Sequence, residues 1–199
     1  MNNKFFAPIA TSFFLLIGLL ASSTAQAQYN DGQPGRDKSL LVKVYPLFFG
    51  PMPRIALAGS VEFKVAESST LQLDGQYGLS YTLDNYNVQY NYFGGQYRYY
   101  FNGFEAFDGF YGGAQVGIGT ATFTEDISKT NGRHFAIPVG IVVGYQFKLT
   151  KKLYLDLFLG PQVAVNGKFE TTNPTSNFFN FKSYDGLSLR SGLGLCYGF

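Results

Sequence analysis

The feature that most restricts the fold of this chain is an alternation of side-chain type with a period of two. From residue 55 the odd positions are apolar or glycine, and the even positions are small or polar: Ile55, Leu57, Gly59, Val61, Phe63 and Val65 against Arg54, Ala56, Ala58, Ser60, Glu62 and Lys64. After a tight turn at Glu67–Ser69 the same pattern restarts and continues to Tyr81. Successive side chains of a β-strand point to opposite faces, so this period predicts strands and not helices.

The same alternation recurs to the end of the chain and predicts an all-β protein. Eight segments fit it: residues 40–49, 54–65, 70–83, 90–101, 109–122, 135–149, 153–165 and 187–199. The segment 40–49 is the least regular, because Leu47, Phe48 and Phe49 place bulky side chains on both faces. Eight sequential strands joined by turns predict an antiparallel up-and-down β-barrel.

The apolar face of these strands is too large to point into the barrel. An eight-stranded barrel has room inside for side chains or one small ligand, whereas about five large apolar residues per strand give roughly forty. A soluble ligand-binding barrel is the alternative, and this volume argues against it. Charged residues are 14% of the chain, well below the ~25% of soluble domains. We therefore expect a transmembrane barrel with its apolar face toward lipid.

The first 27 residues have the pattern of a cleavable secretory signal. Lys4 precedes an apolar run, Phe5–Ala21, and Ala25-Gln26-Ala27 supplies small residues before a cut. An N-terminal membrane anchor is the alternative, but the run contains Pro8 and is short for a spanning helix. Residues 28–199 then form one barrel domain.

The polar face of the strands predicts the contents of the lumen. Five cations and three anions lie on it, with glutamines between them: Arg54, Lys64, Arg98, Lys148 and Arg190, then Glu62, Asp74 and Asp156, then Gln72, Gln76, Gln96, Gln115 and Gln146. Buried charges are costly unless they are paired and hydrogen-bonded, so we expect a polar network across the lumen. A selective conduit is the alternative, although side chains should plug a lumen of this size.

The connections predict which end of the barrel faces outward. Short turns at Ala66–Ser69, Asn102–Asp108 and Thr150–Lys152 fall at one end, and long loops at Phe123–His134 and Asn166–Gly186 fall at the other. Outer-membrane barrels have short periplasmic turns and longer outer loops. Pro138 and Pro161 lie within strands and cannot donate a ladder hydrogen bond, so we also expect a local break in pairing there.

These features resemble the small outer-membrane β-barrels of the OmpA/OmpX type. The resemblance rests on the signal, the amphipathic strands, the segments Gln96–Phe101 and Gly109–Gly112, and the terminal Phe199. It implies location in the cell outer membrane with outer-membrane lipid as a partner. It further implies recognition by the barrel-assembly machinery through the C-terminal strand ending at Phe199. Architecture of this kind does not specify activity.

The sequence predicts a non-enzymatic role in the envelope or in surface contact. No catalytic, cofactor or metal site is predicted. The chain has 15 Lys/Arg and 13 Asp/Glu, so its net charge is too small to produce a positive potential that would attract nucleic acid. The alternative is a barrel enzyme that modifies lipid A. A deacylase-type His–Ser pair is missing, since Ala136 follows His134 by two residues, while an acyl-transfer site would need His134 with Asp126 and Ser128. We expect His134 to be a solvent-exposed residue of the outer rim.

Overall fold

A computed structural model describes residues 38–49, 56–78, 81–83, 86–101, 106–125, 131–171 and 187–199. The predicted signal peptide, residues 1–27, lies outside these residues, as do Arg54, Asp126 and Ser128. No helix in the described part of the chain is long and apolar enough to cross a membrane.

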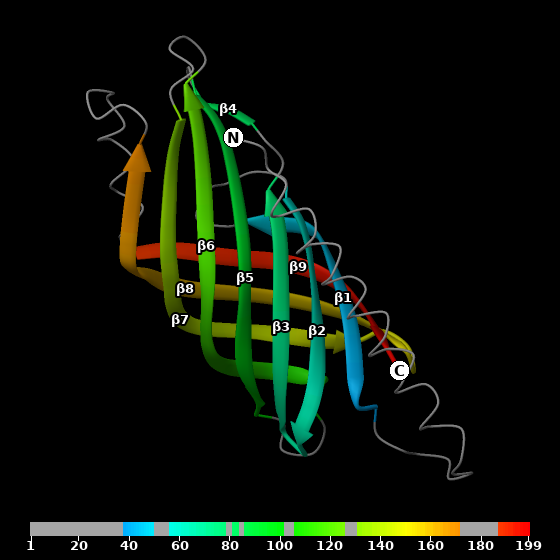
Figure 1. The fold of residues 1–199 in the computed structure, drawn as a ribbon. Helices are drawn as coiled ribbons and strands as arrows, with labels where there is room; N and C mark the ends of the chain where they lie inside the picture. The colour runs from blue at the N-terminus through cyan, green and yellow to red at the C-terminus, as the bar shows by residue number, and fades with distance from the viewer. Residues whose placement is uncertain are drawn as a thin grey trace.

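The described chain forms one antiparallel sheet that closes into a ring (Figure 1). Its strands are β1 (Leu40–Phe49), β2 (Ala56–Ala66), β3 (Ser69–Gly78), β4 (Tyr81–Leu83), β5 (Tyr86–Tyr100), β6 (Gly109–Glu125), β7 (Asn131–Lys148), β8 (Leu153–Thr171) and β9 (Leu187–Gly198). Closure comes from two pairings, β1 with β9 and β3 with β5. The short β4 continues the pairing of β3 along β5. The prediction of an eight-stranded antiparallel barrel is therefore confirmed.

The two faces of the sheet differ in chemistry as the alternation predicts. Paired residues of antiparallel strands share a face, so Lys43, Ser60 and Asp74 form one inward row across β1, β2 and β3. Outward neighbours are large and apolar: Leu57 is 66% exposed, Ile141 58% and Leu187 79%. Only lipid can solvate such a band around a closed barrel.

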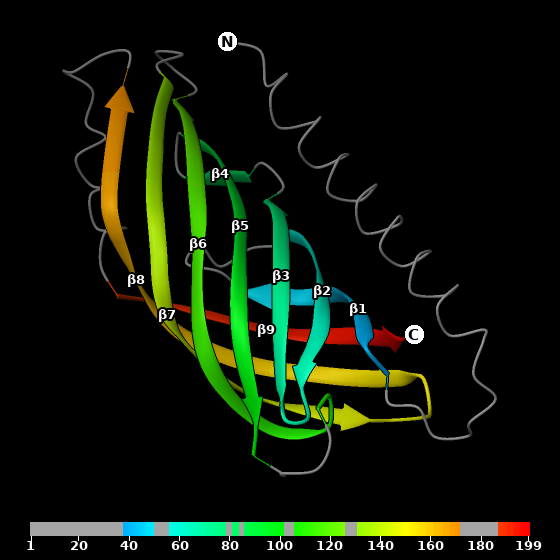
Figure 2. The same ribbon diagram turned by 60° about the horizontal axis from the view of Figure 1, so that its bottom comes forward.

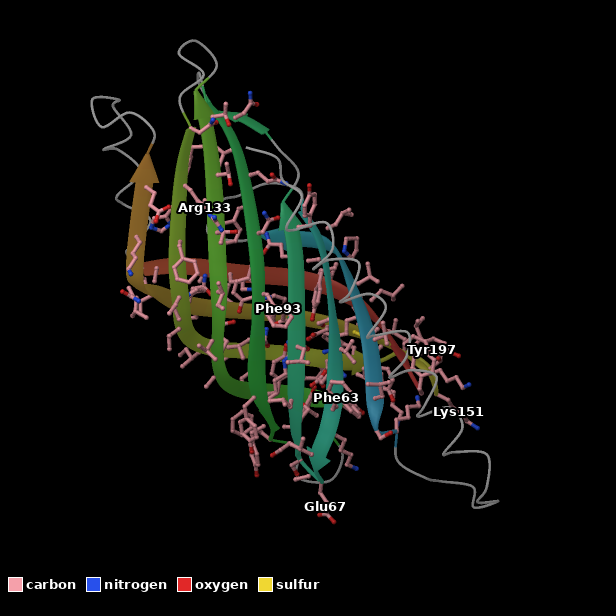
Figure 3. All side chains as sticks on the ribbon, viewed as in Figure 1. Phe63, Glu67, Phe93, Arg133, Lys151 and Tyr197 are labelled. Carbon is pink, nitrogen blue, oxygen red and sulfur yellow. The ribbon has the colours of Figure 1, made fainter. Side chains whose placement is uncertain are left out.

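Aromatic side chains gather at the end of the barrel that carries the short turns. Ring pairs lie at centroid distances of 4.3–5.4 Å: Tyr99 with Phe101, Phe101 with Phe110, Tyr145 with Phe147, and Tyr197 with Phe199. Tyr197 is seen at this end in Figure 3, together with Glu67 and Lys151 of two turns. An aromatic girdle of this kind marks a membrane–water interface.

The strands at the opposite end are longer than the sequence pattern indicated. The predicted bounds of the loop Phe123–His134 are both wrong, since β6 continues to Glu125 and β7 begins at Asn131. Similarly, β8 continues through Asn166 to Thr171. Thr120, Thr122 and Thr124 end the apolar alternation on β6, but the ladder hydrogen bonds do not require apolar side chains. In Figures 1 and 2 the upper parts of β5–β8 extend beyond β1–β3.

The expected break between β7 and β8 is present at Pro161 but not at Pro138, which pairs with Ala164 of β8. Pro138 instead lies on the β6 side in a gap between the pairs Val116↔Val139 and Gly119↔Ala136. The β7–β8 register has a gap between Gly140↔Gln162 and Val143↔Leu159, where Pro161 lies. A separate register shift follows between Phe135 and Ile137, where β8 contains one extra residue. Asn166, with φ 55°, lies in this bulge.

Candidate functional site: the polar lumen

Four charged side chains from four strands meet in the half of the lumen that is nearer the short turns. This four-charge cluster comprises Lys43 of β1, Glu62 of β2, Arg98 of β5 and Asp156 of β8, all with fully buried side chains. The Lys43 Nζ lies 2.5 Å from Glu62 Oε2 and 2.8 Å from Asp156 Oδ2. The Arg98 Nη1 lies 2.9 Å from Asp156 Oδ2 and 3.7 Å from Glu62 Oε2. Each cation therefore contacts both anions.

Hydroxyl groups complete the coordination of the two carboxylates. Asp156 accepts hydrogen bonds from Tyr111 at 2.7 Å and from Tyr45 at 3.2 Å. Glu62 accepts one from Tyr100 at 2.8 Å and another from Thr70. Buried ions are tolerated when such bonds use their remaining lone pairs. The sequence pattern alone does not reveal these donors, because alternation shows the face of a side chain but not which carboxylate its hydroxyl reaches.

A second cluster lies around Asp74 and is joined to the first. Asp74 accepts from Gln72 at 2.6 Å, from Gln96 at 2.7 Å and from Arg190 at 3.3 Å. Arg190 also donates to Gln115 Oε1 at 3.2 Å. The link between the clusters is Arg98 Nε, which donates to Gln96 Oε1 at 2.9 Å. Polar contacts thus connect β1, β2, β3, β5, β6, β8 and β9 across the interior.

Aromatic rings fill the remaining width of the lumen by lying against glycines. The guanidinium of Arg98 sits 4.3 Å from the centroid of Tyr111, and that of Arg190 sits 4.5 Å from Tyr92. A Cβ added at Gly144 would lie 2.5 Å from the Tyr111 hydroxyl, and one at Gly194 would lie 2.6 Å from the Tyr45 ring. Glycine on the inward face is therefore required for space.

Two residues just before β6 are buried at the short-turn end of the barrel. Phe107 is 2% exposed and Ala106 is 3% exposed. The Ala106 amide donates to the Glu67 carbonyl at 2.9 Å, and Gln146 Nε2 donates to the Phe107 carbonyl at 2.8 Å. Phe107 has φ 76°, a region that bulky residues rarely occupy. The two hydrogen bonds hold the backbone of Ala106 and Phe107 in this position.

Most of the predicted lumen residues are where the sequence placed them. Those buried inside are Glu62, Asp74, Arg98, Asp156 and Arg190, with Gln72, Gln96, Gln115 and Gln146. The prediction that Lys148 faces the lumen is wrong, because Lys148 lies at the end of β7 and is exposed. Lys64 and Gln76 are half-buried near the ends of their strands. Lys43 is also buried in the lumen but was not predicted there, because bulky residues on both faces of the segment 40–49 obscure the alternation.

His134 does not occupy the position expected of it. It is 6% exposed and lies on the inward face of β7, paired with Ala121 and Phe169. The expectation of a solvent-exposed rim residue is wrong, because the strands continue past this point. Its possible catalytic companions, Asp126 and Ser128, lie outside the described residues. Within the described ranges, no group of three His, Cys, Asp or Glu side chains could hold a metal ion.

Comparison with protein families gives one match. The family model described as "Protein of unknown function (DUF3575)" matches residues 54–166, more than half of the 199-residue chain. The chain belongs to this family. The matched region contains Glu62, Asp74, Arg98 and Asp156, whereas Lys43 and Arg190 lie on either side of it. No curated protein matches the chain.

Solved structures with the same fold are eight-stranded outer-membrane barrels. The N-terminal β-barrel domain of Pseudomonas aeruginosa OprF is similar with a TM-score of 0.54 and 16% identity, over 82% of this chain and 98% of that one. Neisserial surface protein A is similar with a TM-score of 0.52 and 12% identity, over 80% of this chain and 95% of that one. The resemblance to small outer-membrane barrels is thus confirmed for the fold. The apolar exterior agrees with this fold, because such a surface requires lipid as its solvent.

Proposed function

We propose that this protein is a non-enzymatic outer-membrane barrel whose lumen is closed by its own side chains. The observation that carries the proposal is the convergence of Lys43, Arg98, Tyr45 and Tyr111 on the single carboxylate of Asp156. These donors come from β1, β5 and β6, while Asp156 belongs to β8. A carboxylate held from several walls bridges the lumen and leaves little width for water or solutes.

Charge balance supports a structural role for this network. Among the described residues, the buried Lys, Arg, Asp and Glu side chains are Lys43, Arg98 and Arg190 with Glu62, Asp74 and Asp156. Equal numbers of opposite charges leave no net field to select permeating ions. A barrel of this kind would serve the envelope through its outer surface and its loops, with outer-membrane lipid as its immediate partner.

Ion conductance across planar bilayers tests the closed lumen. We expect the refolded wild-type barrel to show no steady conductance steps. The double variant Lys43→Ala/Glu62→Ala removes one matched charge pair and vacates volume, so it should conduct. Glu67→Ala/Lys151→Ala is the matched control, because it removes the same two charge types from exposed turns. Steady open-pore steps in the wild type would contradict the proposal.

A lipid A incubation tests the absence of catalysis. We expect the wild-type barrel and His134→Ala to release and transfer equally little acyl chain, at the level of the protein-free control. Acyl release that His134→Ala abolishes would establish the lipid-modifying alternative instead.

We also propose that the C-terminal strand is the element that the barrel-assembly machinery recognises. Phe199 directly follows β9 and lies in the aromatic girdle, and its amide donates to the Leu40 carbonyl of β1 at 3.0 Å. It therefore lies at the seam where the first and last strands meet.

A further inference from the structure

The outward surface of β7 and β8 carries charged side chains at the outer end of the barrel. Arg133 of β7 and Lys168 and Glu170 of β8 are all exposed. Arg133 pairs directly with Glu170, and Lys168 pairs with Phe135, two residues farther along β7. Figure 3 shows Arg133 at the end of the barrel opposite Glu67 and Lys151. These three residues are the outer-rim charge group.

The bulge at Asn166 is what turns Lys168 and Glu170 outward. From Tyr154 to Gln162 the even-numbered residues of β8 are buried in the lumen. The extra residue reverses this parity, so that Lys168 falls on the face of Phe135 and Glu170 on the face of Arg133. Without it, both charged side chains would point into the lumen. A bulge that changes the direction of side chains is a specific structural feature of a strand and not a defect.

An apolar strip lies directly beneath these charges on the same two strands. Val139 is 40% exposed, Val163 45% and Val165 43%. Their pairings, Val139↔Val163 and Ile137↔Val165, place them side by side on the lipid face. Cations above an apolar strip match an amphiphile that has an anionic head and acyl chains.

We infer that the outer-rim charge group binds the phosphate of an outer-leaflet glycolipid, whose acyl chains lie along the valine strip. Arg133 and Lys168 are diagonal neighbours on one face, about 7–8 Å apart at their Cα atoms, so both long side chains can reach one phosphate. Glu170 pairs with Arg133 on the same face, and its negative charge weakens the attraction for a phosphate. The inference depends on the membrane location of the barrel but not on the closed lumen, so the conductance result does not affect it.

Binding of diphosphoryl lipid A to the purified barrel in non-ionic detergent tests this inference, with native mass spectrometry as the readout. A basic residue near an anionic membrane surface contributes about a fivefold change in binding, so Arg133→Gln/Lys168→Gln should weaken binding roughly 25-fold. Glu170→Gln should strengthen it, because a repulsive charge is removed. Lys151→Gln/Lys152→Gln, at the short-turn end, is the matched control and should bind as the wild type does.

Three results would overturn the inference. The first is equal binding by the Arg133→Gln/Lys168→Gln variant and the Lys151→Gln/Lys152→Gln control. The second is weaker binding by Glu170→Gln, which would mean that the carboxylate only positions Arg133. The third is full displacement of lipid A by an equal concentration of inorganic phosphate, which would show that the acyl chains contribute nothing. Faster migration of unheated than boiled protein on a detergent gel confirms that each variant is folded.

Discussion

At the scale of the residue, Asp156 is the side chain on which the lumen depends most. Its two oxygens accept hydrogen bonds from Lys43, Arg98, Tyr45 and Tyr111. Because the donors belong to three other strands, Asp156 connects distant walls of the barrel. Removing it would leave two buried cations sharing Glu62 alone.

We predict that Asp156→Ala lowers the free energy of unfolding by about 3–5 kcal/mol, the typical cost of breaking a buried ion pair on one side. Urea unfolding in lipid vesicles, followed by tyrosine fluorescence, measures it. Lys151→Ala, on an exposed turn, should change the free energy by less than about 0.5 kcal/mol. Equal stability of the two variants would mean that the four-charge cluster is dispensable.

Residue parity explains which lumen residues the sequence could reveal. Asp156 lies on a strand with clean alternation, so its inward position follows from the pattern. The strand of Arg98 is mixed, but Phe93, Tyr97, Tyr99 and Phe101 share one parity, which leaves Arg98 on the other face. Lys43 lies on β1, whose register shifts between Val44 and Leu47, and the bulky residues beyond that shift obscured the alternation. Tyr100 and Tyr111 are inward because their hydroxyls reach Glu62 and Asp156, which is a tertiary fact that hydropathy does not contain.

At the scale of the element, β9 has two roles that a substitution can separate. It closes the barrel against β1, and Tyr197 near its end pairs with Phe199, the residue after the strand, in the aromatic girdle. Phe147 on β7 occupies the same girdle with Tyr145, 4.3 Å away, but it is not at a chain end. The two phenylalanines therefore make comparable ring contacts in different sequence positions.

We predict that Phe199→Ala refolds in detergent nearly as well as the wild type, since one ring contact contributes about 0.5–1.5 kcal/mol. In the cell the same variant should accumulate unassembled in the periplasm, because the recognition signal is altered. Fractionation at physiological expression measures it, with Phe147→Ala as the control that assembles normally. Normal outer-membrane levels of Phe199→Ala would remove the proposed signal while leaving the barrel intact.

The ends of the elements were less predictable than their centres. Alternation ends where the strands leave the apolar band, but β6, β7 and β8 remain paired beyond it through backbone hydrogen bonds. The bulge at Asn166 also reverses the parity of β8, so that Lys168 pairs with the outward residue Phe135. A period-two pattern cannot detect either effect, because both depend on the partner strand.

In the whole molecule, the two faces of the closed sheet point in opposite directions and meet different surroundings. The apolar face meets lipid, and the polar face holds a balanced ionic network. Eight strands and their order followed from the sequence, since sequential antiparallel strands can close only with the first beside the last. The contacts across the lumen did not, because they join residues on strands that are not neighbours.

A spin-label scan of residues 153–165 of β8 tests this arrangement most directly. Each position is changed in turn to cysteine and labelled in a Cys196→Ser background, and its collision rate with oxygen is measured in lipid bilayers. We predict a period of two, with maxima at Leu155, Leu157 and Leu159 and minima at Asp156, Phe158 and Gly160. Maxima at the even positions, or no alternation at all, would contradict a barrel that turns its apolar face to lipid and its polar face inward.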